Sequence, residues 1–154
     1  MIALPPQVVI NSINDFCVLY FKDLNHEKDA PSHFHIVFPV NNESGLILTI
    51  ITKQIDKRID YYQRRQKEDA VNALVFVDKD IFDFLTQKSV ADCNRAELLT
   101  KTELLQRIDL RKEMFIKCRD IPSFLKKEIC SAIRKSPLIS PQVKKMVKEV
   151  LKSI

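Results

Sequence analysis

Short runs of hydrophobic residues, each of strand length, divide the first half of the chain. Residues 16–21 are apolar apart from a cysteine and a tyrosine, residues 33–38 alternate between polar and apolar, and residues 46–52 form a continuous run rich in β-branched side chains. A fourth run covers residues 73–77. Such runs are typical of β-strands, and a continuous run indicates a strand that is buried on both faces. We therefore predict four strands in this half.

Turn-forming residues separate the second and third predicted strands. Residues 41–45 read Asn-Asn-Glu-Ser-Gly, and asparagine and glycine accept the backbone conformations that tight turns need. Pro39 has no amide hydrogen, so it ends the hydrogen-bond ladder before the turn. We expect these two strands to pair as an antiparallel hairpin.

Apolar residues in the last third of the chain recur at helical spacing, in three stripes. The first follows Thr100 and Glu103, which fit a capping box, in which two side chains satisfy free amides at the start of a helix. The other two begin behind Pro122 and Pro141, and proline is favoured in a first helical turn because its missing N–H costs nothing there. The patterns predict three helices. The stripes comprise Leu104, Leu105 and Ile108; Phe124, Leu125, Ile129 and Ile133; and Val143, Met146, Val147, Val150 and Leu151.

Two segments between the strands and these helices carry weaker helical signals. Residues 53–69 are highly charged, with Ile55, Ile59 and Tyr62 at spacings of four and three, which predicts either a short amphipathic helix or a mobile loop. Residues 78–85 predict a brief helical turn, because three apolar side chains there are placed to face a core.

Short antiparallel strands followed by helices predict an α+β fold. With 154 residues the chain is long enough for one ordinary core and too short for two independent domains. We expect a single domain, in which residues 1–110 form a small antiparallel β-barrel with short helices and residues 111–154 form a basic helical extension.

Composition excludes several classes of protein. Gly45 is the only glycine, so the chain has no glycine-rich loop of the kind that cradles nucleotide phosphates. The four cysteines include no Cys-x-x-Cys pair, which argues against a zinc site. The apolar runs are much shorter than the roughly twenty residues of a membrane span, and residues 1–10 lack the basic start of a signal peptide. We expect a cytoplasmic protein with no membrane contact, no cofactor and no metal.

Charge is divided unevenly along the chain. Residues 1–110 carry 13 lysines and arginines against 16 acidic residues, whereas residues 111–154 carry 12 against 4. The net charge of +5 therefore comes from the last part of the chain. A basic surface attracts RNA or an acidic protein partner over a Debye length of about 8 Å. A solvated lysine-rich helix face would have the same composition.

The order of these segments resembles the PemK/MazF-like toxin family over about residues 14–110. Asn14-Asp15 opens the first strand where the family has Gly-Asp, Pro31 leads the second strand where the family has Arg-Pro, and residues 47–53 correspond to the family strand that runs into Pro-Ile-Thr-Ser. Residues 72–77 correspond to a later strand. The resemblance implies a small SH3-like β-barrel, usually a homodimer, which cleaves single-stranded RNA without a metal and is neutralised by an antitoxin protein.

Two positions depart from the family pattern. The glycine of the first strand is Asn14, and the catalytic arginine ahead of the proline is Ala30. The resemblance maps the family threonine onto Thr52, whose hydroxyl would steady a phosphate together with Lys53 or Arg58. An RNase built on this chain needs another residue in place of the missing arginine.

His33 and His35 are the best candidates for the base and the acid of RNA cleavage. Positions two apart on a strand share a face, about 6.6–7 Å apart, so both imidazoles can flank one phosphate. Histidine both takes and gives a proton near neutral pH because its reference pKa is about 6.5. Two alternatives remain open: half-buried structural histidines, or a His-x-His metal pair completed by His26 or Asp29.

Two polar segments are further candidates for a site. Residues 61–65 read Tyr-Tyr-Gln-Arg-Arg, so aromatic rings that stack on bases lie beside Arg64 and Arg65, which grip phosphate. A solvated helix face would look the same. Residues 92–95, Asp-Cys-Asn-Arg, either line a site or form a capped turn.

The sequence therefore predicts a toxin-antitoxin endoribonuclease of the PemK/MazF-like type, a hydrolase acting on single-stranded RNA. The alternative is a non-catalytic module that binds RNA or a protein on the same scaffold. The predicted catalytic residues are His33, His35 and Thr52, and the predicted RNA-binding residues are Lys53, Arg58, Arg64 and Arg65.

Overall fold

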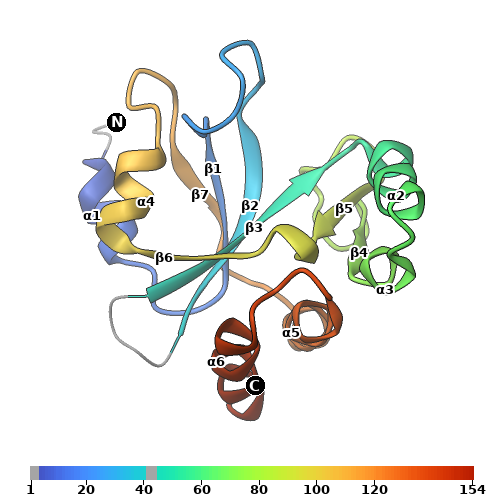
Figure 1. The fold of residues 1–154 in the computed structure, drawn as a ribbon. Helices are drawn as coiled ribbons and strands as arrows, with labels where there is room; N and C mark the ends of the chain where they lie inside the picture. The colour runs from blue at the N-terminus through green and yellow to red at the C-terminus, as the bar shows by residue number, and fades with distance from the viewer. Residues whose placement is uncertain (1–3, 41–44) are drawn as a thin grey trace.

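A seven-stranded antiparallel sheet forms the middle of the protein in a computed structural model that describes residues 4–40 and 45–154 (Figure 1). The strands are ordered β4-β5-β3-β2-β1-β7, and β6 pairs with β3 as well. The prediction of a mixed fold with an antiparallel sheet is confirmed. The strands are β1 (Cys17–Phe21), β2 (His33–Pro39), β3 (Gly45–Thr52), β4 (Leu74–Val77), β5 (Ser89–Asp92), β6 (Glu97–Thr100) and β7 (Phe115–Cys118).

Strand β3 changes partners along its length. Residues 46–50 pair with β2 on one side, whereas on the other side residues 45–48 pair with β6 and residues 51–52 pair with β5. The ladder between β2 and β3 ends where His35 lies opposite Ile50. Beyond this point β3 leaves β2 and continues alongside β5. The two strands therefore form a fork, which we call the β2–β3 fork.

The sheet is open. Within residues 4–40 and 45–154, its path ends at β4 on one side and at β7 on the other, and no pairing joins these two edges. The expectation of a closed β-barrel is therefore not confirmed.

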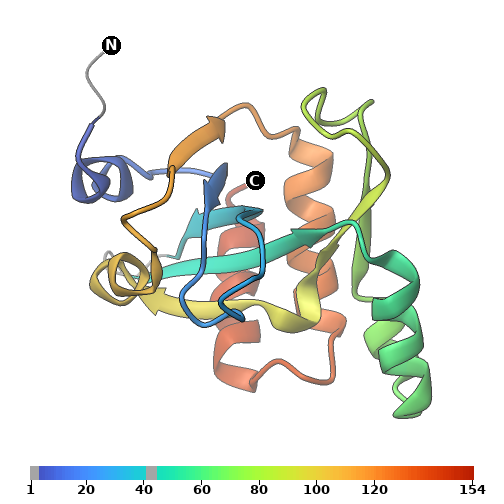
Figure 2. The same cartoon turned by 90° about the horizontal axis from the view of Figure 1, so that it is seen from above.

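Helices surround the sheet on three sides (Figure 1). Helices α1 and α4 lie together at one end of the sheet, α2 and α3 lie at the opposite end, and α5 and α6 lie beneath it. Seen from above, α5 and α6 lie side by side behind the central strands (Figure 2). None of the helices in the described ranges has the length and apolar composition that crossing a membrane requires. The helices are α1 (Pro6–Asn11), α2 (Ile55–Arg64), α3 (Glu68–Val71), η1, a 3-10 turn (Cys93–Arg95), α4 (Lys101–Arg107), α5 (Ser123–Lys135) and α6 (Pro141–Lys152).

Two apolar cores lie on opposite faces of the central strands. Val18 and Ile36 share one core with Leu125 of α5, and Leu19 and its neighbours share the other core with Leu104 of α4. Successive residues of a strand point to opposite faces, so one strand contributes to both cores. This arrangement explains why residues 46–52 form a continuous apolar run: every one of these residues is buried.

Most local predictions are confirmed. The four predicted strands appear within one residue of their expected bounds, and β2 and β3 pair as a hairpin, although the turn at residues 41–44 lies outside the described residues. Thr100 and Glu103 form the capping box, with both N–H···O distances at 3.0 Å. The segment 53–69 contains α2, whose Tyr62 is buried, and it is not a plain loop.

Other predictions are wrong or incomplete. Residues 78–85 form turns, one of which has the helical hydrogen bond from the Phe82 N–H to the Asp78 carbonyl, so the expected brief helical turn is present but is not extended into a helix. Three short strands, β5, β6 and β7, were not predicted. The expected helical extension, residues 111–154, begins with the strand β7, which pairs with β1, and its helix α5 completes the larger core.

Neighbouring residues of α5 test how far this segment supports the fold. Leu125 is completely buried, whereas Phe124 is 57% exposed. We expect Leu125→Ala to lower the free energy of unfolding by about 2–5 kcal/mol, because it removes buried methyl groups and leaves a cavity. The matched control Phe124→Ala should change it by less than ~0.5 kcal/mol. Urea denaturation followed by circular dichroism measures both, and equal effects would show that α5 is not part of the core.

Candidate functional site

A cleft of about 990 Å³ opens at the β2–β3 fork. Its walls come from the loop after β1, the first residues of β2, the end of β3, helix α2, η1 and β7. The fork creates the opening, because the strand pairing that would close it ends at His35 and Ile50. Polar side chains of the lining include His26, His33, Thr52, Lys53, Arg58 and Arg95.

His33 lies at the mouth of the fork. Its Nδ1 is buried and has no hydrogen-bond partner among the described residues, which leaves Nε2 as the ring nitrogen for a ligand. The ring centroid of His26 lies 5.5 Å away, with the two rings edge to face. Burial lowers the pKa of His33, and the neighbouring His26 lowers it further. His33 is therefore neutral at pH 7, as a general base must be.

His26 adjoins both His33 and a buried carboxylate. Its Nε2 lies 3.8 Å from the Asp23 carboxylate. Burial lowers the pKa of His26, and the negative charge of Asp23 partly opposes this shift. Sequence reasoning considered His26 only as a metal ligand. In the part of the chain that the structure describes, no three His, Cys, Asp or Glu side chains form a cluster that suits a metal ion.

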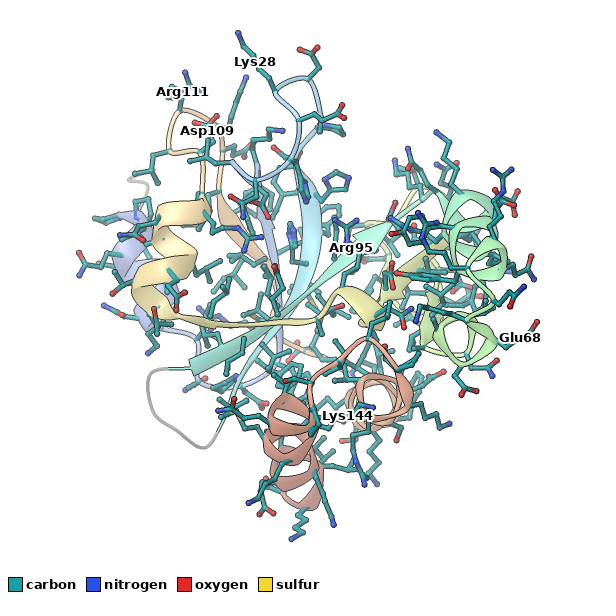
Figure 3. The ribbon with its side chains drawn as sticks, viewed as in Figure 1. Lys28, Glu68, Arg95, Asp109, Arg111 and Lys144 are labelled. Atoms are coloured by element: carbon teal, nitrogen blue, oxygen red, sulfur yellow. The ribbon has the colours of Figure 1, made fainter. Side chains whose placement is uncertain are left out.

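Three cationic side chains line the cleft, and each is held differently. Arg95 projects from η1 between β2 and α2 (Figure 3), is exposed, and makes no ion pair or hydrogen bond within the described ranges. Arg58 is mostly buried, with its Nε 3.5 Å from the Asp92 carboxylate. Lys53 donates a hydrogen bond to the Thr86 hydroxyl at 3.3 Å. Arg95 is thus the cation most available to an anionic ligand.

Thr52 contributes a hydroxyl where β3 ends. Its Oγ accepts a hydrogen bond from the backbone N–H of Gln54 at 3.2 Å. The hydroxyl hydrogen is therefore available to donate to a ligand in the cleft. The structure brings together four of the residues predicted from sequence, namely His33, Thr52, Lys53 and Arg58.

A buried network of hydrogen bonds positions the arginines. The Asp92 carboxylate accepts hydrogen bonds from the Tyr62 hydroxyl at 2.8 Å and from the backbone and side chain of Asn94 at 3.2 and 3.0 Å. The first contact fixes α2, which carries Arg58, and the second fixes η1, which carries Arg95. Residues 92–95 therefore form a capped turn, and Arg95 of this turn lines the cleft.

His35 lies outside the cleft, contrary to its predicted place in the site. It is 2% exposed, its ring stacks on Phe21 at 4.1 Å, and its Nδ1 lies 3.1 Å from the backbone oxygen of His33. Burial lowers the pKa of His35 to about 3. The ring centroids of His33 and His35 are 6.4 Å apart, but only His33 reaches the cleft. His35 lines a smaller hollow of about 330 Å³, which shares His26 and Arg95 with the cleft.

Arg64 and Arg65 also lie outside the cleft lining, on the exposed face of α2. Arg64 forms an ion pair with Asp60 at 3.0 Å, and the guanidinium of Arg65 lies 3.6 Å from the ring centroid of Tyr61. Tyr62 is buried, so the segment 61–65 does not present alternating rings and charges to one ligand. Its side chains form a solvated helix face beside the cleft.

Sequence reasoning included Arg95 only as part of the polar motif 92–95, without a role of its own, and it missed three aromatic residues. Tyr20, Phe34 and Phe115 line the cleft from three different strands. Nothing in their local sequence indicates that they meet, because β7 was not predicted.

Comparison with known proteins does not extend this description. No protein-family model matches the chain, and no curated protein is significantly similar to it. The resemblance to PemK/MazF-like toxins therefore stays a prediction from the sequence, and the geometry of the cleft carries the functional argument.

The buried His35 predicts how stability depends on pH. Its pKa is about 3 in the folded protein and about 6.5 in an unfolded chain, so the unfolded chain binds more protons between these values. Stability should therefore fall as pH decreases, by up to ~1.4 kcal/mol for each pH unit below about 6.5 from this residue. In His35→Phe, urea denaturation between pH 4.5 and 7 should show a shallower dependence. Identical slopes in both proteins would mean that His35 is solvated.

Proposed function

We propose that the protein is an endoribonuclease of the PemK/MazF-like toxin type, which cleaves single-stranded RNA in the cleft without a metal ion. One observation carries the proposal: a neutral imidazole, a hydroxyl and a guanidinium without an ion-pair partner in the described part of the chain line one cleft, at His33, Thr52 and Arg95. RNA cleavage through the 2′-hydroxyl needs a base, an acid and donors for the phosphorane charge. The cleft contains candidates for each.

His33 acts as the base in this mechanism. It takes the proton of the 2′-hydroxyl, and the resulting oxygen attacks the adjacent phosphorus. Arg95, Arg58 and the Thr52 hydroxyl stabilise the negative charge that develops on the phosphorane.

His26 acts as the acid. It donates a proton to the 5′-oxygen as the phosphorus–oxygen bond breaks, which leaves a 2′,3′-cyclic phosphate and a 5′-hydroxyl. For this step His26 must be protonated, and the charge of a bound phosphate favours that form. At the end His33 is protonated and His26 is neutral, so the proton count balances.

Arg95 replaces the catalytic arginine of the family, whose position corresponds to Ala30 in this chain. Ala30 also lines the cleft, so a guanidinium reaches the same space from η1 instead of from the loop before β2. We propose an open variant of the SH3-like barrel as scaffold, because β3 pairs with β2, β5 and β6. A homodimer and an antitoxin partner belong to the same proposal and rest on the resemblance, and a cytoplasmic location belongs to it as an expectation from the sequence.

A non-catalytic RNA-binding module is the second candidate. The burial of His35 favours it, because only one of the two predicted imidazoles reaches the cleft. The basic helix α6, marked by Lys144, lies away from Arg95 and could bind RNA separately (Figure 3). This candidate predicts RNA binding that weakens steeply with salt and no cleavage.

Cleavage of a fluorescent single-stranded RNA in EDTA tests the nuclease proposal. We expect His33→Ala to slow cleavage by about 10²–10⁴-fold, the usual contribution of general base catalysis. Arg95→Ala should slow it by about 10²-fold or more, as for a lost charge-stabilising donor.

Arg111→Ala is the matched control for Arg95→Ala. Arg111 is exposed, forms an ion pair with Asp109 and lies far from Arg95 (Figure 3). Its loss should leave cleavage unchanged. Absence of cleavage by the unaltered protein, or equal rates for the His33→Ala variant and the unaltered protein, would reject the mechanism.

The lowered pKa values of both imidazoles predict an acid-shifted activity profile. The base must be neutral and the acid protonated, and burial lowers the pKa of His33 and of His26. The profile of kcat/KM, which reports the free enzyme, should be a bell centred below about pH 6.5. The kcat profile should lie at higher pH, because bound phosphate raises both values. A kcat/KM optimum above neutral pH would contradict these roles.

A further inference from the structure

A row of aromatic rings crosses three strands beside the catalytic cleft. Tyr20 of β1 lies opposite Phe34 of β2 and opposite Phe115 of β7. Its ring centroid is 4.9 Å from that of Phe34 and 5.1 Å from that of Phe115, with the rings tilted by 52° and 31°. We call Phe115, Tyr20 and Phe34 the aromatic row.

The aromatic row is anchored at one end and open at the other. Phe34 contacts Phe84 at a centroid distance of 4.7 Å, and Phe84 stacks at 5.2 Å on Phe82, which is buried in the larger core. The three rings of the row remain partly exposed and line the cleft. A row that served only the core would have no reason to end in a cleft lined by cations.

Position along β2 links the row to the proposed chemistry. His33 and Phe34 are consecutive, so their side chains point to opposite faces of β2. Both nevertheless line one cleft, because the strand has no partner on the β3 side at this point. A phosphate at His33 would therefore have its nucleoside within reach of Phe34 and Tyr20.

We propose that the aromatic row binds unpaired bases of the RNA by stacking, while Arg95, Arg58 and Lys53 hold the phosphates. Aromatic rings on a sheet beside cations are the usual means of binding single-stranded RNA, since every base has a face that can stack. The proposal rests on RNA being the substrate of the cleft. The expected substrate is RNA whose bases next to the scissile phosphate are unstacked, and duplex RNA is not expected to bind.

Binding of an RNA oligonucleotide that is 2′-O-methylated throughout tests the row. This probe cannot be cleaved through its 2′-oxygen, so the result is independent of catalysis. We expect Tyr20→Leu and Phe115→Leu each to weaken binding by about 5- to 100-fold. Phe115→Tyr, which keeps an aromatic ring, should bind like the unaltered protein.

A matched probe without bases separates stacking from charge. An abasic oligonucleotide of the same length keeps the phosphates, so the Leu variants and the unaltered protein should bind it equally. The salt dependence of binding should stay the same in the Leu variants and should decrease in Arg95→Ala, because only the arginine displaces counterions.

Tyrosine fluorescence tests the row in the unaltered protein, in case a Leu variant fails to fold. The chain has three tyrosines and no tryptophan, so stacking on Tyr20 should quench the emission with the base-containing probe and not with the abasic one. Tyr20→Phe should lose this quenching and keep the affinity. If the Leu variants bind the base-containing probe as tightly as the unaltered protein, or if both probes quench the emission equally, the aromatic row does not bind bases. The cleavage assay tests the nuclease proposal independently of this result.

Discussion

The buried carboxylate of Asp92 is the interaction on which the rest of the site depends. A charge removed from water costs several kcal/mol unless it is fully paired, so its partners must all be in place when the chain folds. Tyr62 brings α2 to it, and Asn94 brings η1. Asn94 also accepts a hydrogen bond from Ser136 at 2.7 Å, which ties the turn between α5 and α6 to the same point. One carboxylate thus joins three parts of the fold around the cleft.

The open sheet has a functional consequence. Had β3 stayed paired with β2 to its end, His33 and Thr52 would be neighbours within a continuous ladder, without space for a ligand between the strands. Because the pairing of β3 with β2 ends at Ile50 while β3 continues beside β5 on its other side, the two strands separate and leave this space. The cleft therefore follows from strand pairing, and the side chains at its walls come from segments far apart in the sequence.

Most helices and strands could be predicted from patterns in adjacent residues. The elements that could not be predicted are those that form only by pairing with distant parts of the chain. Continuous apolar runs and the Thr100 capping box identify elements from a few adjacent residues. The strands β5, β6 and β7 have only four residues each and become strands through partners distant in the chain. The same limit applies to the site. The residue types of His33 and Thr52 indicated roles in proton transfer and phosphate binding, whereas the position of Arg95 at the cleft depends on the hydrogen bonds of Asp92.

His33 and His35 show why spacing alone could not define the proposed catalytic residues. They lie two positions apart on one face of β2. Phe21 covers the ring of His35, whereas the fork exposes the ring of His33. Burial lowers the pKa of all three imidazoles, so near neutral pH the cleft presents the positive charge of its arginines without protonated histidines beside them. A bound phosphate would add the negative charge that stabilises a protonated His26. In the proposed mechanism, binding of the anionic substrate and protonation of His26 are therefore coupled.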